Sequence, residues 1–284
     1  MIYLVYSVLC AIWGSTWMAI KIGVAEAPPL YSSGFRFAIA ATVIWGIILV
    51  QRRRLPDTVE RFVRRGIPGL FMFGISYAMV YLAEEHLSSA LTSALFASFT
   101  FFIALFSIFM LPAERLRLLH WCGLLIGFVG VVIISLDSMQ VSQSLLWGVI
   151  LAVGGAVTSA FGTVLHKRCF SRDDIVVSAG IQMLFGFVPL LLAALLFENP
   201  ADFSMNARSV GSLLYLALIG TVVTFLGYYW LLARIRVVVV SAIGYITPVV
   251  AIVLGYLVLG EQLTLFEMSG VVLVLGGVIM VSHK

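Results

Sequence analysis

Residues 88–111 read SSALTSALFASFTFFIALFSIFML, a run of 24 residues without a charged side chain. A helix that crosses the hydrocarbon core of a bilayer needs about 20 consecutive, mostly apolar residues. The apolar residues of this run are continuous, whereas the strands of a membrane β-barrel alternate apolar with polar residues. The stretch therefore predicts a membrane-spanning helix.

Nine further runs have the same length and character. The ten predicted spans are residues 2–20, 30–51, 66–84, 88–111, 118–136, 145–166, 174–197, 209–232, 236–259 and 265–282. Only 11% of the 284 residues are charged and 62% are hydrophobic, whereas a soluble domain has about 25% charged residues. We predict an all-α integral membrane protein with ten transmembrane helices, each satisfying its own backbone polar groups.

The basic residues lie between these runs. The connections at 52–65, 115–117, 167–172 and 234–236, with Lys284, carry 14 of the 17 Lys and Arg residues, and the opposite connections carry two. The positive-inside rule then places both termini in the cytoplasm of a multi-pass inner-membrane protein. This placement explains the net charge of +4 without a nucleic-acid partner. The three cysteines form no pair with metal-site spacing, so no metal or other cofactor is predicted.

The chain repeats itself at an offset of 147 residues. One ungapped register matches Glu114 with Glu261, Gly123 with Gly270, Gly130 with Gly277 and Tyr81 with Tyr228. Each half, residues 1–137 and residues 144–284, then holds five spans, and because five is odd the second half is inverted. Inverted repeats recur in secondary transporters, whose halves exchange conformations around a central site. The alternative is the duplication of a structural bundle.

Several short motifs carry a family resemblance. They are Trp13-Gly14-Ser15, Thr247-Pro248, Leu259-Gly260-Glu261-Gln262-Leu263 and a weaker first copy at Leu111-Pro112-Ala113-Glu114-Arg115-Leu116. Over essentially the whole chain the sequence resembles the ten-helix EamA-type branch of the drug/metabolite transporter superfamily. The resemblance implies a basket of helices around a central cavity, with the fifth and tenth packed at the back. It also implies export or facilitated movement of small metabolites, with aromatic-amino-acid exporters as the nearest group. Phe101 replaces the proline that Pro248 supplies in the second half, which predicts a softer break in the fourth span.

Aromatic and hydroxyl side chains inside the spans are the candidate substrate-binding residues. The aromatic candidates are Trp13, Trp17, Tyr77, Tyr81 and Tyr228, and the polar ones, with Tyr245 beside them, are Thr92, Thr100, Ser159, Thr163, Ser241 and Thr247. Ring faces can hold an apolar group or a cationic amine. Pro248 frees the carbonyl of Gly244, which only protein or a wet cavity can satisfy inside a membrane. The alternatives are an interfacial aromatic belt and a simple kink in which a hydroxyl bonds its own helix.

Arg36 is the basic residue that lies well inside a span. A guanidinium suits a substrate carboxylate, and a charge within a membrane span is a functional-site hypothesis by default. Because the second span starts near Leu30, snorkelling of Arg36 to the surface is an equally good interpretation.

Other titratable groups cluster at the ends of spans. They are Glu84, Glu85, His86, His166 and Lys167. Their position favours solvated loop charges over a proton-coupling site, because a charged side chain at the end of a span costs little free energy. No carboxylate is expected at mid-membrane, which favours facilitated diffusion or weak proton coupling.

The function these features favour is secondary transport of a small neutral or zwitterionic metabolite. The expected substrates are amino acids, above all aromatic ones, and the expected mechanism is export by alternating access. Phosphate-bearing compounds are disfavoured. A membrane-embedded enzyme is not favoured, since HExxH, GxSxG and Walker-type motifs are absent. A structural or receptor-like bundle, or a transporter of other small drugs, remains the alternative. The expected partners are a small molecule, the bilayer and a second copy of the chain, with glycines at 123, 127, 270, 276 and 277 packing within or between chains.

Overall fold

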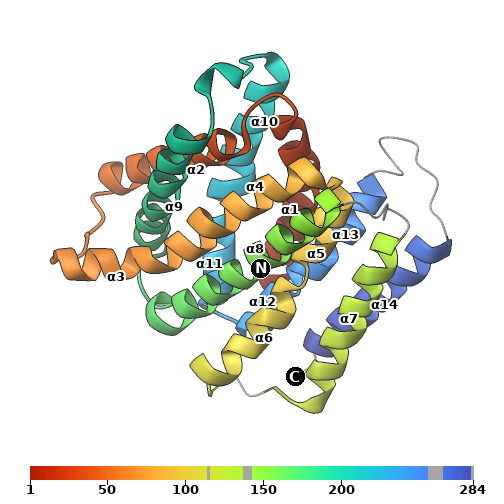
Figure 1. Ribbon diagram of the computed structural model, residues 1–284. Helices are drawn as coiled ribbons and strands as arrows, with labels where there is room; N and C mark the ends of the chain where they lie inside the picture. The colour runs from red at the N-terminus through yellow and green to blue at the C-terminus, as the bar shows by residue number, and fades with distance from the viewer. Residues whose placement is uncertain (114–115, 137–142, 255–264, 283–284) are drawn as a thin grey trace.

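The computed structural model describes residues 1–113, 116–136, 143–254 and 265–282, which form helices joined by short connections (Figure 1). In the first half the elements are α1 (Ile2–Val24), α2 (Pro29–Val50), α3 (Val59–Gly69), η1 (Leu70–Ile75), α4 (Ser76–His86), α5 (Ser89–Phe96), α6 (Phe99–Met110) and α7 (Leu118–Leu136). In the second half they are α8 (Gln143–Phe170), α9 (Ile175–Phe197), η2 (Pro200–Asp202), α10 (Ala207–Ala217), η3 (Leu218–Val223), α11 (Thr224–Leu232), α12 (Val237–Ser241), α13 (Ile243–Leu254) and α14 (Leu265–Ser282). The motif glutamates Glu114 and Glu261 lie outside the described residues.

Seven helices in the described ranges are long and apolar enough to cross a membrane. They are Ile2–Val24, Pro29–Val50, Val59–His86, Leu91–Met110, Leu146–Phe170, Ile175–Phe197 and Ala207–Leu232. Three shorter apolar helices cover Leu118–Gly130, Val237–Val250 and Met268–Val281. Each of the ten predicted spans falls on one of these apolar helices, and the all-helical membrane architecture is confirmed.

Four spans change their helical geometry part-way along. The third and eighth contain the π-helical segments η1 and η3, and the fourth and ninth are divided into α5–α6 and α12–α13. A π-helical turn displaces backbone groups from the regular ladder and is frequent at functional sites. η1 and the interrupted fourth and ninth spans contribute residues to the central cavity described below, and η3 bonds the lining residue Arg36.

The break in the ninth span is not where its proline predicts it. The interruption lies at Ala242, whereas Pro248 is inside α13. The fourth span is also divided, between Phe96 and Phe99, although it has no proline there. The Thr100 hydroxyl donates a 2.7 Å hydrogen bond to the Ser241 carbonyl, so one interrupted helix satisfies the other. The contact therefore satisfies a carbonyl at the break in the ninth span, and the fourth span is divided without a proline.

The main packing contacts join helices of different halves. α1 packs against α13 and α11, while α8 packs against α6 and α4. The second and seventh spans, α2 and α9, pack against each other, as do α7 and α14, which stand side by side at one edge of the bundle (Figure 1). Advancing each helix by five spans turns the pair α1–α13 into α8–α6 and the pair α1–α11 into α8–α4. The same step turns α2–α9 and α7–α14 into themselves.

Close backbone contact between α7 and α14 depends on glycine. A Cβ on Gly277 would lie 2.6 Å from the Gly123 carbonyl oxygen, and one on Gly130 would lie 2.7 Å from the Gly270 carbonyl oxygen. Gly127 faces the Tyr245 ring. Gly276 has open space around it, so it does not pack against the described residues of its own chain. The packing glycines are used within the chain and give no argument for a homodimer.

Gly277→Ala is expected to destabilise the protein by about 1–3 kcal/mol, because the added methyl group would overlap backbone atoms that cannot move independently. Gly276→Ala is the matched control, one residue away in open space, where alanine should slightly favour the helix. Thermal unfolding of the two purified variants in detergent measures the difference. Equal melting temperatures for both would contradict the close α7–α14 packing.

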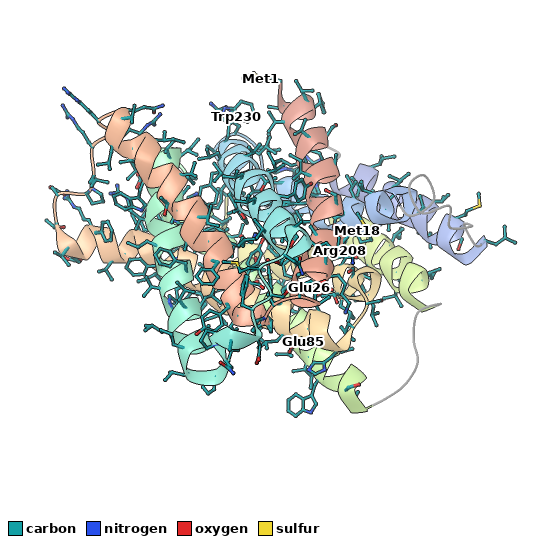
Figure 2. All side chains as sticks on the ribbon, turned by 90° about the horizontal axis from the view of Figure 1, so that it is seen from above. Met1, Met18, Glu26, Glu85, Arg208 and Trp230 are labelled. Carbon is teal, nitrogen blue, oxygen red and sulfur yellow. The ribbon has the colours of Figure 1, made fainter. Side chains whose placement is uncertain are left out.

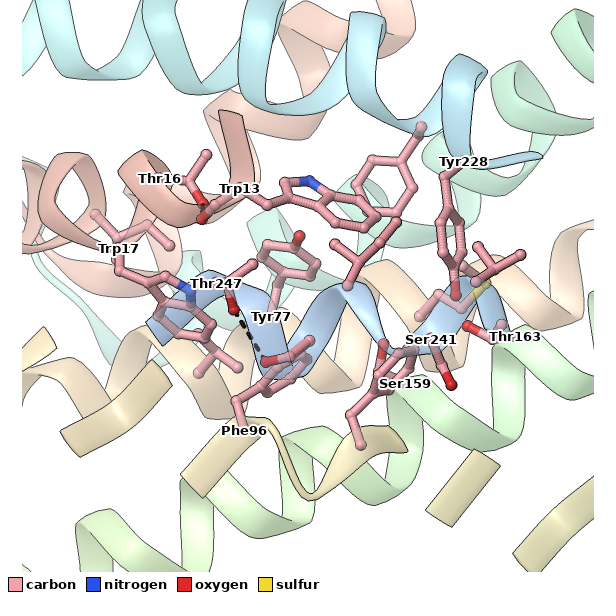
Figure 3. A pocket seen from close by; sticks show the side chains of 18 of the residues that line it. Trp13, Thr16, Trp17, Tyr77, Phe96, Ser159, Thr163, Tyr228, Ser241 and Thr247 are labelled. Atoms are coloured by element: carbon pink, nitrogen blue, oxygen red, sulfur yellow. Dashed lines mark hydrogen bonds between the residues drawn. The ribbon is translucent and has the colours of Figure 1, made fainter. Parts of the chain in front are cut away.

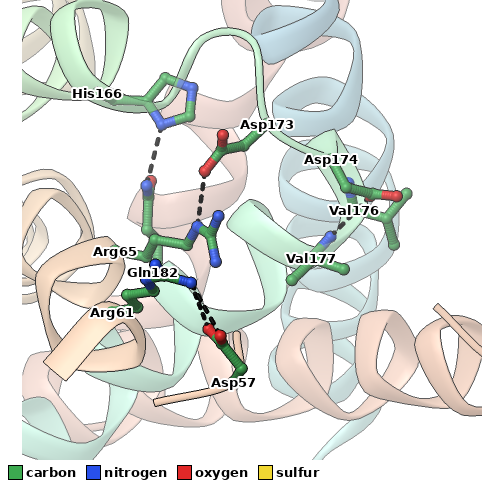
Figure 4. A network of polar contacts seen from close by, with 9 residues as sticks. All are labelled: Asp57, Arg61, Arg65, His166, Asp173, Asp174, Val176, Val177 and Gln182. Carbon is green, nitrogen blue, oxygen red and sulfur yellow. Dashed lines mark hydrogen bonds and ion pairs between the residues drawn. The ribbon is translucent and has the colours of Figure 1, made fainter. Parts of the chain in front are cut away.

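One end of the bundle gathers basic connections. Arg53 forms an ion pair of 2.6 Å with Asp174. Arg65 forms one of 2.6 Å with Asp173 (Figure 4). These bonds join the connection after α2, and helix α3, to the connection before α9. Burial raises the pKa of the Asp174 carboxyl, but hydrogen bonds from the amides of Val177 and Val176 and the Arg53 guanidinium outweigh it and hold that pKa below its usual value.

The opposite end of the bundle carries a different set of contacts. The Glu198 carboxylate accepts hydrogen bonds from the amides of Leu30 and Tyr31, at 2.8 and 2.9 Å, and so caps the first turn of α2. Asn206 donates to Glu26 at 2.6 Å. Figure 2 shows Glu26 at the far end of α1 from Met1. Connections that the charge pattern assigns to one side of the membrane are thus found together.

Candidate functional site

A cavity of about 80 Å³ lies at the centre of the bundle (Figure 3). One buried water needs roughly 10–15 Å³ by a comparable measure, so the space holds several waters or part of a small molecule. The lining residues come from α1, α2, η1, α4, α5, α6, α8, α11, α12 and α13, that is, from both halves. One of these lining side chains, Arg36, is charged, and none of those described is acidic.

Nine of the thirteen candidate residues line this cavity together. They are Trp13, Trp17, Arg36, Tyr77, Ser159, Thr163, Tyr228, Ser241 and Thr247. They come from seven helices and are spread over 235 positions of sequence. Residues four apart on α1 (Trp13 and Trp17) and on α8 (Ser159 and Thr163) share a face, which is why the helical spacing could identify them.

The other four candidates lie behind the cavity wall. The Tyr81 hydroxyl accepts from Arg36 at 3.3 Å, and the Thr100 hydroxyl is bonded to Ser241 as described above. Thr92 donates to the Ser88 carbonyl at 2.9 Å, within its own helix. The Tyr245 hydroxyl donates to the Leu124 carbonyl at 3.0 Å and faces α7. Tyr81 and Thr100 therefore contact cavity residues, whereas Thr92 and Tyr245 are bonded elsewhere.

Aromatic rings form much of the cavity surface. Trp13 lies 5.1 Å from Tyr228 and 5.4 Å from Phe225 between ring centroids, and Trp17 lies 5.5 Å from Phe96. These tilted and edge-on arrangements are the favoured geometries of aromatic pairs. Phe96, Phe99 and Phe225 were missed by the sequence analysis, although the spacing of Phe225 and Tyr77 is close to the repeat offset. The rings are buried inside the bundle, so an interfacial belt does not describe them.

Some buried polar atoms at the cavity lack a hydrogen-bond partner among the described residues. The Trp13 indole N–H donates no hydrogen bond there, and the hydroxyls of Tyr228 and Thr163 have at most each other as partners. Buried polar groups are normally hydrogen-bonded, and exceptions often mark a site for water or a ligand. An apolar, ring-lined cavity with a few convergent polar groups is a typical small-molecule site.

At Thr247 the structure shows the arrangement in which a hydroxyl bonds a carbonyl of its own helix. Its hydroxyl donates to the carbonyl of Gly244 at 3.1 Å, so the carbonyl that Pro248 frees is satisfied within the same helix. Gly244 and Thr247 also line the cavity. The Thr247 oxygen keeps its capacity to accept a hydrogen bond from a bound molecule.

Arg36 does not snorkel. Its side chain is buried within the bundle, with 1% of the residue exposed. Its guanidinium donates to the Thr221 hydroxyl at 2.8 Å and to the Gly220 carbonyl at 3.0 Å, both in η3. It also lies 4.9 Å from the Tyr77 ring centroid. The structure therefore rules out the interpretation in which Arg36 reaches the membrane surface.

A second buried polar cluster lies outside the cavity. The His166 ring is stacked on Tyr229 at 4.1 Å, and the Tyr229 hydroxyl donates to the Gln182 side chain. Figure 4 shows the bond of 2.9 Å between Gln182 and His166 Nδ1. His166 and Tyr229 are 2% and 1% exposed, so the expectation of a solvated charge was wrong for His166. Gln182, which lies 146 positions after Arg36, could have been found from the repeat.

Two lysines join helix ends on opposite sides of the cavity. Lys21 donates to the carbonyls of Glu84 and Leu87 (2.8 Å to Leu87), and we name this contact the Lys21 latch. In the Lys167 latch, Lys167 donates to the carbonyls of Leu232 and Ile235 (3.0 Å to Ile235). Cations are favoured at helix C-termini, where carbonyls lack intrahelical partners.

The position of each latch follows from the cavity lining. Lys21 is next to the lining residue Ile20, whereas Lys167 and Leu232 each lie one helical turn beyond lining residues of α8 and α11. Both latches are formed at once in this structure, and we call the cavity closed in this sense.

Glu84 differs from the neighbouring charges at the end of the third span. Glu85 and His86 are exposed as expected, but the Glu84 side chain is buried. One carboxyl oxygen accepts from Ser89 at 3.3 Å, and the other has no hydrogen-bond partner. The expectation of a solvated charge was therefore wrong for Glu84, because α4 continues to His86 and turns this residue inward.

Long apolar helices that surround a closed, ring-lined cavity define a multi-pass membrane protein of the transporter class. The model of the EamA-like transporter family matches residues 1–136 and again residues 146–283. The chain belongs to the EamA-like transporter family, which is a family of transporters and not of enzymes.

Several proteins named as transporters are similar to this chain over nearly its whole length. The "Uncharacterized transporter YoaV" of Bacillus subtilis is 30% identical over 95% of this chain and 92% of its own length. The "Uncharacterized inner membrane transporter YedA" of Escherichia coli is 28% identical over 96% and 88%. A "Probable amino-acid metabolite efflux pump" of Salmonella typhimurium is 26% identical over 94% and 89%. One solved crystal structure matches with a TM-score of 0.80 and 22% identity over 98% of this chain and 95% of its own, which shows a shared fold.

Proposed function

We propose that this transporter exports small neutral or zwitterionic metabolites across the inner membrane by alternating access. Amino acids, with aromatic ones as the leading candidates, are the proposed substrates. The observation that carries the proposal is the closed cavity between the two halves, lined by Trp13, Trp17, Tyr77 and Tyr228. The rings suit an aromatic or apolar side chain, and the name of the Salmonella typhimurium relative, an amino-acid metabolite efflux pump, supports amino acids as cargo.

We further propose that all ten apolar helices cross the membrane as two inverted five-helix repeats, residues 1–137 and 144–284. Three features support this. The family model matches the chain twice, the helix pairs of the two halves are equivalent, and π-helical segments occur in both the third and the eighth span. The Lys21 and Lys167 latches also occupy equivalent places in the two halves. With both termini in the cytoplasm, the Lys167 latch lies at the inner end of the cavity.

The nine lining candidates are the proposed substrate-binding residues, with Tyr81 and Thr100 supporting them from behind. In alternating access the closed state opens at one end at a time. The Lys21 latch would break in the outward-open state and the Lys167 latch in the inward-open state, since each joins helices at one end of the cavity.

Counterflow in proteoliposomes tests the function. Vesicles loaded with an unlabelled amino acid should transiently accumulate the same labelled amino acid, and vesicles without the protein should not. A panel of aromatic, aliphatic and polar amino acids identifies the substrate. A structural or receptor-like bundle predicts no flux of any compound, so the absence of flux across the panel would favour that alternative, or cargo of another kind such as a drug.

Coupling to protons is expected to be weak. No acidic side chain is among the described residues that line the cavity, so substrate and proton do not share a carboxylate there. An imposed pH difference across the vesicle membrane should change the initial uptake rate by about twofold or less. Strict dependence of uptake on the pH difference would show that a group outside the cavity, with Glu84 as the first candidate, carries the proton.

A further inference from the structure

Arg36 is a buried cation that forms no ion pair among the described residues. Its hydrogen bonds go to neutral acceptors, the Thr221 hydroxyl, the Gly220 carbonyl and the Tyr81 hydroxyl. Neutral acceptors and the Tyr77 ring hold the guanidinium in place but do not cancel its charge.

Arginine cannot escape this situation by losing its proton, because the guanidinium stays charged in proteins. An unpaired charge in a low-dielectric interior is unfavourable, and within a membrane span such a group marks a functional site by default. The guanidinium has five N–H donors, and three of them are used in the bonds above. Arg36 lines the cavity, so a bound molecule can reach the remaining donors.

The second half places a neutral side chain in the region that corresponds to Arg36. Gln182 lies 146 positions after Arg36, and Tyr229 lies 148 after Tyr81, each one position from the ungapped register of 147. Gln182 on α9 accepts a hydrogen bond from the Tyr229 hydroxyl on α11, whereas Arg36 on α2 donates one to the Tyr81 hydroxyl on α4, and both residues are buried. The other bonds differ, since Arg36 bonds η3 and Gln182 bonds His166 of α8. The positive charge at position 36 is an addition on one side of the cavity.

We propose that Arg36 binds the carboxylate of the transported molecule, and that this carboxylate is the group the cavity requires. The substrate class is then small carboxylates with an apolar or aromatic body, amino acids included. The amine is not required, because no acidic side chain among the described lining residues is present to pair with it. The rings of Trp13, Trp17 and Tyr228 hold the body of the molecule. This inference rests on the proposed transport function and specifies the chemistry of its site.

Four probes of one shape test the inference: phenylalanine, 3-phenylpropionate, phenylalanine amide and phenethylamine. Each competes with labelled phenylalanine for counterflow in proteoliposomes, and each is also tested for stabilisation of the detergent-purified protein against heat. The two carboxylates should compete and stabilise, and the amide and the amine should require at least tenfold higher concentrations. Equal effects of all four compounds, or a preference for the amine, would overturn the proposal.

Arg36→Gln introduces the side chain that the second half already uses, and it should abolish the preference for carboxylates. Arg208→Gln, at an exposed position of α10, is the control for loss of one positive charge and should keep the preference. If Arg36→Gln does not fold, the four-probe comparison on the wild-type protein still decides. If the protein shows flux but no preference for carboxylates, this inference is contradicted and the proposed transport function is not. If carboxylates selectively stabilise the protein but no flux is measured, the site is supported and the transport function is contradicted. If neither is observed, both the inference and the transport function are contradicted.

Discussion

Trp13→Ala is expected to reduce the counterflow rate at least tenfold while the protein remains folded. The Trp13 ring contacts Tyr228 and Phe225 and forms part of the cavity wall. Its indole N–H has no hydrogen-bond acceptor among the residues that the structure describes. A ring contact with substrate contributes about 0.5–2 kcal/mol and a hydrogen bond about 0.5–1.5 kcal/mol. Since about 1.4 kcal/mol corresponds to a factor of ten in affinity, the loss of both explains the expected effect.

The control for this substitution is Trp147→Ala. Trp147 is on α8 but is 61% exposed, on the outside of the bundle, so its removal should leave the counterflow rate unchanged. Trp13→Phe keeps a ring and loses the N–H, and should give an intermediate rate. Elution of each variant as a single peak in size-exclusion chromatography confirms folding. A folded Trp13→Ala protein with the wild-type rate would show that substrate does not contact this wall.

Lys21→Met and Lys167→Met are expected to loosen opposite ends of the bundle. Each lysine donates two hydrogen bonds to carbonyls at the end of another helix, and hydrogen bonds to a charged group contribute about 1.5–3 kcal/mol. The loss of a latch should therefore raise the population of the state open at that end by tenfold or more, since the apolar methionine keeps the packing of the lysine stem.

Hydrogen–deuterium exchange measures this change directly, because local opening determines amide exchange. In Lys21→Met, peptides covering residues 84–90 should exchange at least tenfold faster, and peptides covering 230–237 should not. Lys167→Met should give the reverse pattern, so each variant is the control for the other. Equal acceleration at both ends in either variant would indicate general destabilisation and contradict the assignment of one latch to each end.

Much of the architecture could be predicted from the sequence because a bilayer demands long apolar helices. The positions of the apolar helices follow from the apolar runs, and the family follows from short motifs; the contact between α7 and α14 was expected from the family resemblance. The spacing of Trp13 with Trp17, and of Ser159 with Thr163, placed both pairs on the cavity side of their helices. These properties are local, or repeat along a single helix, and so can be read from one chain.

What could not be predicted depends on contacts between distant segments. The burial of Arg36 results from η3, 184 and 185 residues later, where Gly220 and Thr221 accept its hydrogen bonds. The break at Ala242 depends on Thr100 of another helix, although Pro248 pointed to a different position. Glu84 and His166 lie near helix ends, where sequence favours solvated charge, and only the packing of neighbouring helices buries them.

Alternating access of the central cavity is tested most directly with a cysteine at Ser159, a lining residue on α8, in a protein whose Cys10, Cys122 and Cys169 have been replaced. A membrane-impermeant thiol reagent is applied to reconstituted protein from one side and then, in separate vesicles, from the other. We expect modification from both sides, and slower modification from both when a saturating transported amino acid is present. Modification from one side only, or rates that no transported substrate changes, would contradict a cavity that opens alternately and binds the substrate.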